Sequence, residues 1–317
     1  MKIYRHLDEF QQVTKAVVTI GTFDGVHIGH RKIISRLTEV AKKINGESVI
    51  LTFFPHPRMI LNPEDESLKL ISTINEKATL LEQLGVDHLI ITPFNRDFSN
   101  LSAETYIRQI LVDKIGTSHI IIGYDHRFGK DREGNIQKLQ EFAPKNNFDV
   151  EEIPEQDIND VAVSSTQIRN ALIKGDVQTA NAFLGYSFSL FGQVIKGDQL
   201  GRTLGFPTAN LLIEENYKLI PGDGIYAVKV KINPDSPVLG QTSETYKGMA
   251  YIGNRPTING MSRNIEVNIF DFNQDIYREY ICIEFLHFIR GDIRFDNIEA
   301  LKIQITNDKQ TALNLLS

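Results

Sequence analysis

GTFDGVHIGHRKI, residues 21–33, decides the fold of the first half of the chain. The apolar run 16–20 comes directly before it and predicts a buried strand of a parallel sheet. After the turn, apolar residues recur at helical spacing: Ile33, Ile34, Leu37, Val40, Ala41 and Ile44. The segment therefore predicts a strand, a tight turn and a helix, in that order.

Two histidines, His27 and His30, stand at the start of this helix with Gly29 between them. Helix N-termini bind phosphate because their free backbone N–H groups and the helix dipole point at the anion. Two imidazoles there could hold the phosphates of a nucleotide, and Gly29 lets a ligand approach the backbone. The alternative is an ordinary helix start with two surface histidines. Between a strand and an amphipathic helix, HIGH resembles the signature of the nucleotidylyltransferase superfamily, which attacks the α-phosphate of ATP.

The bulk composition bounds the class of protein. A length of 317 residues favours two domains, and 41% apolar with 23% charged residues is ordinary for a globular protein. The net charge of −6 gives no electrostatic reason to expect nucleic-acid binding, and no apolar run approaches the ~20 residues that span a bilayer. Cys282 is the only cysteine, and we expect it to be buried. The N-terminus lacks the apolar core of a signal peptide, and together with the single cysteine this leads us to expect a cytoplasmic protein.

The first half alternates strands and helices. Strands are predicted over 16–23, 48–54, 88–93, 119–123 and 149–153, and helices over 31–44, 74–84 and 103–115. Ser102 is expected to cap the third of these helices. This rhythm predicts a doubly wound α/β domain with a parallel sheet, whose ligands bind at the carboxyl ends of the strands.

The pattern changes near Tyr186. Residues 164–184 predict two short helices, broken near Gly175, and Gly185 is expected to end the second. Partly alternating strands over 187–195, 225–232, 245–252, 265–272 and 280–288 predict a small antiparallel β-barrel, closed or half closed. A last amphipathic helix, over 297–316, is expected to pack on it. We therefore divide the chain into domains of residues 1–185 and 186–317.

Two loops at the carboxyl edge of the predicted sheet carry further candidate residues. FFPHP, residues 53–57, predicts a stiff loop because two prolines flank a histidine. GYDHRFG, residues 123–129, combines the carboxylate of Asp125, the guanidinium of Arg127 and the ring of Phe128. That set could hold a flat ring beside an anion, although a plain polar loop would have the same composition.

VSSTQIR, residues 163–169, places three hydroxyls at the start of a predicted helix and Arg169 one turn later. Hydroxyls, free backbone N–H groups and an arginine suit a triphosphate. The alternative is that one of these hydroxyls simply caps the helix.

GRTLGFPTAN, residues 201–210, is the strongest motif of the second half. The hydroxyl of Thr208 and the amide of Asn210 suit Mg²⁺ that already bridges ATP phosphates, whereas the alternative is a Gly/Pro loop leading into a strand. Glu266, at the start of an apolar strand, is either placed for proton transfer or an edge charge that points to solvent. Arg263, near Glu266 in the sequence, could contact phosphate, but a surface salt bridge would explain it equally well.

Together these motifs resemble those of bacterial bifunctional riboflavin kinase/FAD synthetases, over nearly the whole chain. The resemblance rests on GTFDGVHIGH, FFPHP, NRDFSNLSAETYI, GYDHRFG and SSTQIR in the first half, and on GRTLGFPTAN, PGDGIYAV and GMAYIGNRPT in the second. It implies that the second domain phosphorylates riboflavin with ATP and that the first adenylylates the FMN formed, releasing pyrophosphate. It also implies Mg²⁺ as cofactor and riboflavin, FMN and ATP as partners, with no nucleic acid or membrane; the oligomeric state stays open.

The resemblance implies roles for single residues as well. His27, His30 and Arg169 would act on the ATP phosphates, and Glu266 would be the general base of the kinase. The other nucleotide-binding residues that it implies are Gly21, Phe23, Gly29, Ser164, Thr166, Gly201, Thr208 and Asn210, the last two also as metal ligands. The flavin-binding residues that it implies are Asp125, Arg127, Phe128 and Asn254.

One position departs from the family pattern. The family's loop more often reads GxDFRFG, and His126 here replaces the first phenylalanine, which bears on flavin packing in the loop. Three alternatives stay open: a first domain that acts on another phosphorylated metabolite, a kinase that has lost adenylylation, and a flavin-binding regulator without turnover. The intact HIGH, SSTQIR and PTAN motifs weigh against the regulator, because a sensor has no need of two ATP sites.

Overall fold

The computed structural model describes residues 1–65, 67–154, 163–197, 200–234, 244–257 and 260–317, and their side chains except at 200, 254–257 and 260–262. The chain forms two compact units. The first comprises Met1–Leu68 and Ile74–Ser164, and the second comprises Lys69–Thr73 and Ser165–Ser317. The domain boundary at 185/186 lies further along the chain and remains a prediction.

The first unit is built on a six-stranded sheet in which every neighbouring pair is parallel, in the order β1-β4-β3-β2-β5-β6. The strands are β1 (Lys2–Tyr4), β2 (Ala16–Ile20), β3 (Glu47–Phe53), β4 (His88–Thr92), β5 (Thr117–Gly123) and β6 (Asp149–Ile153). Strand β2 lies between β3 and β5, so the strand order reverses beside β2. Such a reversal opens a crevice at the carboxyl ends of the strands, where doubly wound folds bind ligands.

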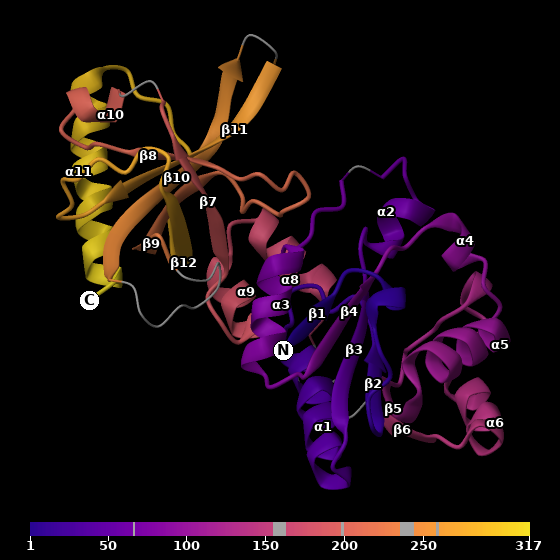
Figure 1. The fold of residues 1–317 in the computed structure, drawn as a ribbon. Helices are drawn as coiled ribbons and strands as arrows, with labels where there is room; N and C mark the ends of the chain where they lie inside the picture. The colour runs from indigo at the N-terminus through magenta and orange to yellow at the C-terminus, as the bar shows by residue number, and fades with distance from the viewer. Residues whose placement is uncertain (66, 155–162, 198–199, 235–243, 258–259) are drawn as a thin grey trace. The chain divides into compact units, whose positions relative to one another are not determined.

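Helices cover both faces of this sheet, as a doubly wound fold requires (Figure 1). Helix α1 (Ile28–Ile44) packs on β2 and β3, with α3 (Ile74–Gln83) on the same side in Figure 1. The π-helical segment η2 (Tyr106–Ile115) and helix α6 (Ile136–Asn146) cover the other face, where Val18, Leu51 and Ile120 join their apolar side chains in one core. The predicted fold class of this half is confirmed.

Several elements of the first unit differ from prediction. The helix predicted over 103–115 is α5 (Ala103–Thr105) followed by η2, and Ser102 caps it as predicted, accepting from the Thr105 N–H at 3.1 Å. Strand β1 and helix α6 were not predicted; β1 has three residues at an exposed edge, and α6 contains Pro144. The remaining short elements are η1 (Leu7–Glu9), α2 (Pro57–Leu61), α4 (Arg96–Ser99) and η3 (Lys130–Arg132).

The second unit begins with the predicted helix pair, α8 (Ser165–Ile173) and α9 (Val177–Leu184). Gly175, between the helices, has a φ of +81°, and Gly185 adopts the left-handed conformation as the C-cap of α9. Both conformations favour glycine, which explains the break and the stop that the sequence predicted.

An antiparallel barrel follows and closes in the order β10-β11-β8-β7-β12-β9 (Figure 1). Its strands are β7 (Ser189–Ile195), β8 (Ala209–Leu212), β9 (Gly224–Ile232), β10 (Thr245–Thr257), β11 (Gly260–Ile269) and β12 (Tyr280–Arg290). Helix α10 (Leu200–Thr203) precedes β8, and α11 (Ile298–Leu315) packs on the barrel beside Met249 and Phe270. Cys282 is buried, as predicted. Strand β8, only four residues long, was not predicted.

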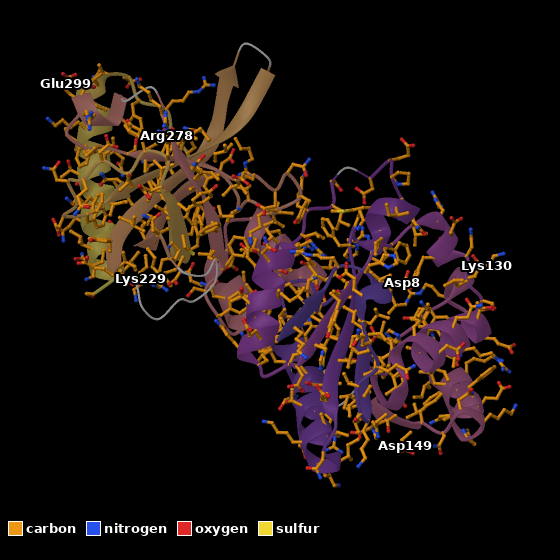
Figure 2. The ribbon with its side chains drawn as sticks, in the orientation of Figure 1. Asp8, Lys130, Asp149, Lys229, Arg278 and Glu299 are labelled. Atoms are coloured by element: carbon orange, nitrogen blue, oxygen red, sulfur yellow. The ribbon has the colours of Figure 1, made fainter. Side chains whose placement is uncertain are left out.

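The outer surfaces of both units carry charges of both signs. Figure 2 labels three acidic and three basic side chains, all of them exposed: Asp8, Lys130, Asp149, Lys229, Arg278 and Glu299. Within the described ranges, no helix has both the length and the apolar character that crossing a membrane requires.

Candidate active sites

The turn after β2 has an unusual backbone. Phe23 and Val26 have positive φ angles of 45° and 39°, and Gly25 between them has a φ of 79°. Bulky and β-branched residues rarely adopt positive φ, and such strain gathers at ligand-binding sites. Phe23 and Val26 are nonetheless buried, so packing holds the turn in this shape.

The two histidines of this turn lie against each other. His27 is the N-cap of α1, and its Nδ1 accepts a hydrogen bond from the His30 N–H at 3.4 Å. The two rings stack with centroids 3.6 Å apart, and the ring of Phe23 meets His30 edge-on at 5.2 Å. Because His27 is only 5% exposed, the alternative of two ordinary surface histidines is wrong.

His30 is held as a neutral imidazole. Burial lowers its pKa well below the ordinary value, and the neighbouring His27 and Lys77 lower it further. Its Nδ1 is buried and has no hydrogen-bond partner among the residues that the structure describes. Such a ring atom is available to a ligand, because an unsatisfied buried polar atom costs free energy until a partner binds.

Three loops with predicted site residues leave neighbouring strands at the same edge of the sheet. The HIGH turn follows β2, FFPHP follows β3 and GYDHRFG follows β5, and β2 lies between the other two. In FFPHP, His56 caps α2 by accepting from the Arg58 N–H at 3.2 Å. The loops therefore surround the ligand crevice expected for this fold.

In the GYDHRFG loop, two polar side chains are exposed and the phenylalanine ring is buried. Asp125 and Arg127 are exposed, whereas Phe128 is 7% exposed and lies 5.3 Å from the ring of Tyr106 in the core. The Phe128 and Gly134 backbones exchange two hydrogen bonds that close the loop, at 3.2 and 2.8 Å. The flavin-binding roles of Asp125, Arg127 and Phe128 remain predictions.

His126, at the position that departs from the family pattern, stacks on Phe128 at a centroid distance of 5.9 Å. Its Nε2 is buried without a hydrogen-bond partner in the described part of the chain. Burial lowers the pKa of His126 to about 4, with a smaller opposing effect from Asp125. His126 therefore places a neutral imidazole, with one unpartnered ring nitrogen among the described residues, where the family pattern has the apolar ring of phenylalanine.

The SSTQIR motif lies at the start of α8, as predicted. Ser164 and Thr166 are exposed, and the Arg169 Nε donates to the Lys69 carbonyl at 3.0 Å. Lys69 and Arg169 both belong to the second compact unit. The phosphate-binding roles of Ser164, Thr166 and Arg169 remain predictions.

The barrel brings together the three polar residues predicted for the site of the second unit, Thr208, Asn210 and Glu266. Glu266 on β11 is in register with Asn210 on β8. The Thr208 Oγ1, just before β8, donates to Glu266 Oε2 at 3.0 Å, and the Asn264 Nδ2 donates to Oε1 at 2.6 Å. Because both carboxylate oxygens accept hydrogen bonds, Glu266 is not a charge that simply points to solvent. Its strand begins earlier than predicted, at Gly260.

This carboxylate borders a mostly apolar pocket of about 270 Å³ between the barrel and α11. Its lining includes Gly201, Phe206, Thr208, Met249, Glu266 and Ile305. A smaller pocket of about 90 Å³ is lined by residues that include Arg202, Thr208, Asn273 and Tyr277. Thr208 lines both pockets.

Two glycines allow a close approach near this corner. A Cβ at Gly197 would overlap the Asn210 amide, and one at Gly201 would overlap the Phe206 carbonyl. Packing against backbone therefore requires glycine at Gly201, whereas a side chain at Gly197 would have to displace the Asn210 side chain. The side chain of Asn254, a predicted flavin ligand, lies outside the described part of the chain.

Two candidate residues were missed by the sequence analysis. Asn264 holds Glu266, but this contact depends on the conformation of β11 and leaves no signal in the sequence. Lys77 on α3 is only 4% exposed, and its place among the apolar residues of that helix was a readable signal. Arg263 forms the predicted salt bridge, to Asp223 at 2.5 Å.

The chain is similar to known proteins over its whole length. The family model described as FAD synthetase matches residues 9–167, and that described as Riboflavin kinase matches residues 184–316. "Bifunctional riboflavin kinase/FMN adenylyltransferase" of Haemophilus influenzae is 37% identical, covering 98% of each chain. The protein of the same name from Listeria monocytogenes is 36% identical, covering 97% of this chain and 96% of its own.

A solved structure shares the fold of the whole chain. It is named "Macrolide-efflux Protein" from Streptococcus pneumoniae, with a TM-score of 0.86 and 30% identity over 99% of this chain and 98% of its own. We take only the fold from this match, because its name does not agree with those of the curated relatives.

Proposed function

This chain belongs to the bifunctional riboflavin kinase/FMN adenylyltransferase family, and from that premise we propose how its residues divide the two reactions. The enzyme makes flavin cofactors: it phosphorylates riboflavin to FMN, then adenylylates FMN to FAD with release of pyrophosphate. We assign the kinase to residues 186–317 and the adenylyl transfer to residues 1–185.

In the kinase, we assign the pocket of about 270 Å³ to the flavin ring. Its apolar lining suits a flat aromatic ligand, and Glu266 at its border can take the proton of the terminal ribityl hydroxyl. Thr208 and Asn264 fix the orientation of the carboxylate. The observation that carries this assignment is this doubly hydrogen-bonded carboxylate at the edge of an apolar pocket.

Thr208 and Asn210 fit a Mg²⁺ ion on the nucleotide. The Thr208 hydroxyl donates a hydrogen bond to Glu266, so the lone pairs of its oxygen remain available to a cation. Asn210 lies opposite Glu266 and offers a neutral carbonyl oxygen, a ligand that hard cations accept. When bound, Mg²⁺ supplies charge neutralisation to the phosphates of ATP. We assign the smaller pocket beside Thr208 to the nucleotide. Gly201 lines the larger pocket but lies next to Thr208, and we propose that its backbone contacts the nucleotide from there.

In the adenylyl transfer, two anions must meet, because the FMN phosphate attacks the α-phosphorus of ATP. An FMN phosphate is already ionised at neutral pH, so the site must neutralise charge and has no need of a general base. We assign His27, His30 and the start of α1 to the ATP phosphates, with Gly21, Phe23 and Gly29 shaping the turn.

The other predicted residues complete this site in our proposal. Ser164, Thr166 and Arg169 contact the phosphates, and Asp125, Arg127 and Phe128 lie at the flavin. Asn254 contacts the flavin of the kinase. We propose that the neutral ring of His126, which stacks on Phe128, takes the place of the phenylalanine of the family pattern in this loop. We also propose a cytoplasmic location, where ATP is plentiful and the thiol of Cys282 stays reduced.

One incubation tests the assignment. The purified protein is mixed with riboflavin, ATP and Mg²⁺, and the flavins are separated by chromatography over time. FMN that appears first and is then converted to FAD supports the proposal. FMN alone identifies a kinase without adenylylation, and bound but unchanged riboflavin identifies a regulator; either result contradicts the proposal.

A further inference from the structure

Lys77 is a buried lysine on the apolar side of α3. It is 4% exposed, and its neighbours at helical spacing are Ile74, Leu80 and Leu81, of which Leu80 and Leu81 are buried. Among the described residues, its ammonium group has no hydrogen bond and no ion pair within 4.0 Å. Lysine is almost never buried in this way without a partner, because the charged form loses its hydration.

The charges near Lys77 belong to the HIGH turn. Burial lowers the pKa of Lys77 to about 8, and the carboxylate of Asp24 opposes this shift. The positive charge of Lys77 in turn helps to lower the pKa of His30. Asp24 itself is 1% exposed. The ammonium therefore lies within electrostatic reach of both His30 and Asp24, at the turn assigned to ATP.

Two groups at this turn lack the partner that their chemistry requires. The Nδ1 of His30 is buried and unpartnered in the described chain. The side chain of Lys77 is buried, and no carboxylate among the described residues lies within 4.0 Å of its ammonium group. A phosphate oxygen accepts hydrogen bonds from both kinds of group. The carboxylate of Asp24 opposes the lowering of the Lys77 pKa, so it favours the protonated form of Lys77 when no phosphate is bound.

We propose that Lys77 donates a charge-assisted hydrogen bond to the phosphate chain of ATP in the adenylyl transfer, as a binding residue beside His27 and His30. This inference rests on the proposed function of the first domain. The ammonium offsets negative charge as the FMN phosphate approaches, and it stays with the pyrophosphate that leaves. No covalent bond to Lys77 forms or breaks.

The proposal predicts opposite effects on stability and activity. Lys77→Met removes a buried charge and keeps a side chain of similar length, so it should leave the melting temperature unchanged or raise it. The same substitution should remove a contact to a charged ligand, which costs about 10- to 100-fold in affinity or rate. A lysine with a purely structural role would lower both stability and activity when replaced.

The test uses the full chain and four proteins: wild type, Lys77→Met, Lys77→Arg and the control Lys42→Met, at an exposed position of α1. Conversion of FMN to FAD, phosphorylation of riboflavin, inhibition by added pyrophosphate and the melting temperature are measured for each. We expect Lys77→Met to lower kcat/KM for ATP in FAD formation about 10- to 100-fold and to weaken pyrophosphate inhibition. We expect kinase activity to stay at the wild-type level, Lys77→Arg to recover part of the loss, and Lys42→Met to behave as wild type.

Two results would overturn the inference. One is a Lys77→Met protein whose kcat/KM for ATP and pyrophosphate inhibition match the wild type. The other is a loss of FAD formation that comes with a lowered melting temperature and unchanged pyrophosphate inhibition of the residual activity. If the wild-type protein itself makes no FAD from FMN, the proposed function fails instead, so the two failures are distinguishable.

Discussion

Thr208 Oγ1 lies 3.0 Å from Glu266 Oε2 and donates a hydrogen bond to it. The bond joins the PTAN motif to the strand that carries the proposed general base, although the two residues are far apart in the sequence. Because Thr208 lines both pockets of the barrel, we propose that the same contact orients the base and presents an oxygen to the nucleotide. The proposed kinase chemistry depends on this pair.

Thr208→Val should weaken the kinase in two ways. The substitution removes the oxygen offered to Mg²⁺ and one of the two hydrogen bonds to Glu266. We expect a loss of kcat/KM for Mg-ATP of about 10- to 100-fold, since a hydrogen bond to a charged group is worth about 1.5–3 kcal/mol. Steady-state kinetics of FMN formation measure it, with Thr306→Val, at an exposed position of α11, as the control. A variant with unchanged kinetics would remove Thr208 from the site.

Glu266→Gln should stop FMN formation and spare FAD formation. Glutamine keeps the shape of the side chain but cannot take a proton, and general-base catalysis is worth about 10²- to 10⁴-fold in rate. The kcat of riboflavin phosphorylation is expected to fall by that factor, while FMN supplied from outside is still converted to FAD. Glu299→Gln, on the surface of α11, is the matched control (Figure 2). Retention of kinase activity by Glu266→Gln would exclude proton transfer to this carboxylate.

Asp308→Ala should destabilise the wall of the flavin pocket. Asp308 on α11 is buried and accepts three hydrogen bonds from Arg290 of β12: from Nε to Oδ1 at 3.0 Å, from Nε to Oδ2 at 3.1 Å and from Nη2 to Oδ2 at 2.6 Å. Its removal leaves a partly buried guanidinium without its partner, which costs about 1.5–3 kcal/mol. We expect a lower melting temperature and a raised KM for riboflavin, with adenylylation of FMN as the internal control. If the KM for riboflavin stayed at the wild-type value, α11 would have no part in flavin binding.

His126 predicts a pH dependence of stability. Its folded-state pKa is depressed from 6.5 to about 4 by burial, so the folded protein keeps the imidazole neutral while the unfolded chain binds a proton. The unfolded state therefore gains protons first as the pH falls, and stability is lost between about pH 6.5 and pH 4. Over this pH range, the melting temperature of His126→Phe should depend less on pH than that of the wild type. His6→Phe, at an exposed position, should show the pH dependence of the wild type. Equal slopes for wild type and His126→Phe would contradict the burial of a neutral ring.

The general architecture was readable from the sequence because its signals are local. Apolar runs and glycine stops gave the parallel sheet, the helix pair and the barrel. The turn that we propose for phosphate binding was predictable for the same reason: its residues lie within a few positions of each other, from Gly21 to His30. Boundaries moved where packing decides them, as for α1, which begins at Ile28 before the apolar periodicity starts.

Contacts between distant segments were not readable. The pairing of Glu266 with Thr208 depends on the order β10-β11-β8 in the barrel, which no local pattern specifies. The packing of the Phe128 ring against Tyr106 was not predictable either, because burial depends on what the loop folds against. Lys77 was missed because a helical lysine is usually solvated, and only its place among apolar residues indicates otherwise.

The central claim is that one chain holds two separate ATP sites, and the most direct measurement is both half-reactions on His30→Ala and Glu266→Gln side by side. His30→Ala should lose about 10²- to 10³-fold in FAD formation, as when a donor to developing charge is removed, and keep FMN formation. Glu266→Gln should show the reverse. If either variant lost both activities while its melting temperature stayed at the wild-type value, the division of the two reactions between the two sites would be contradicted.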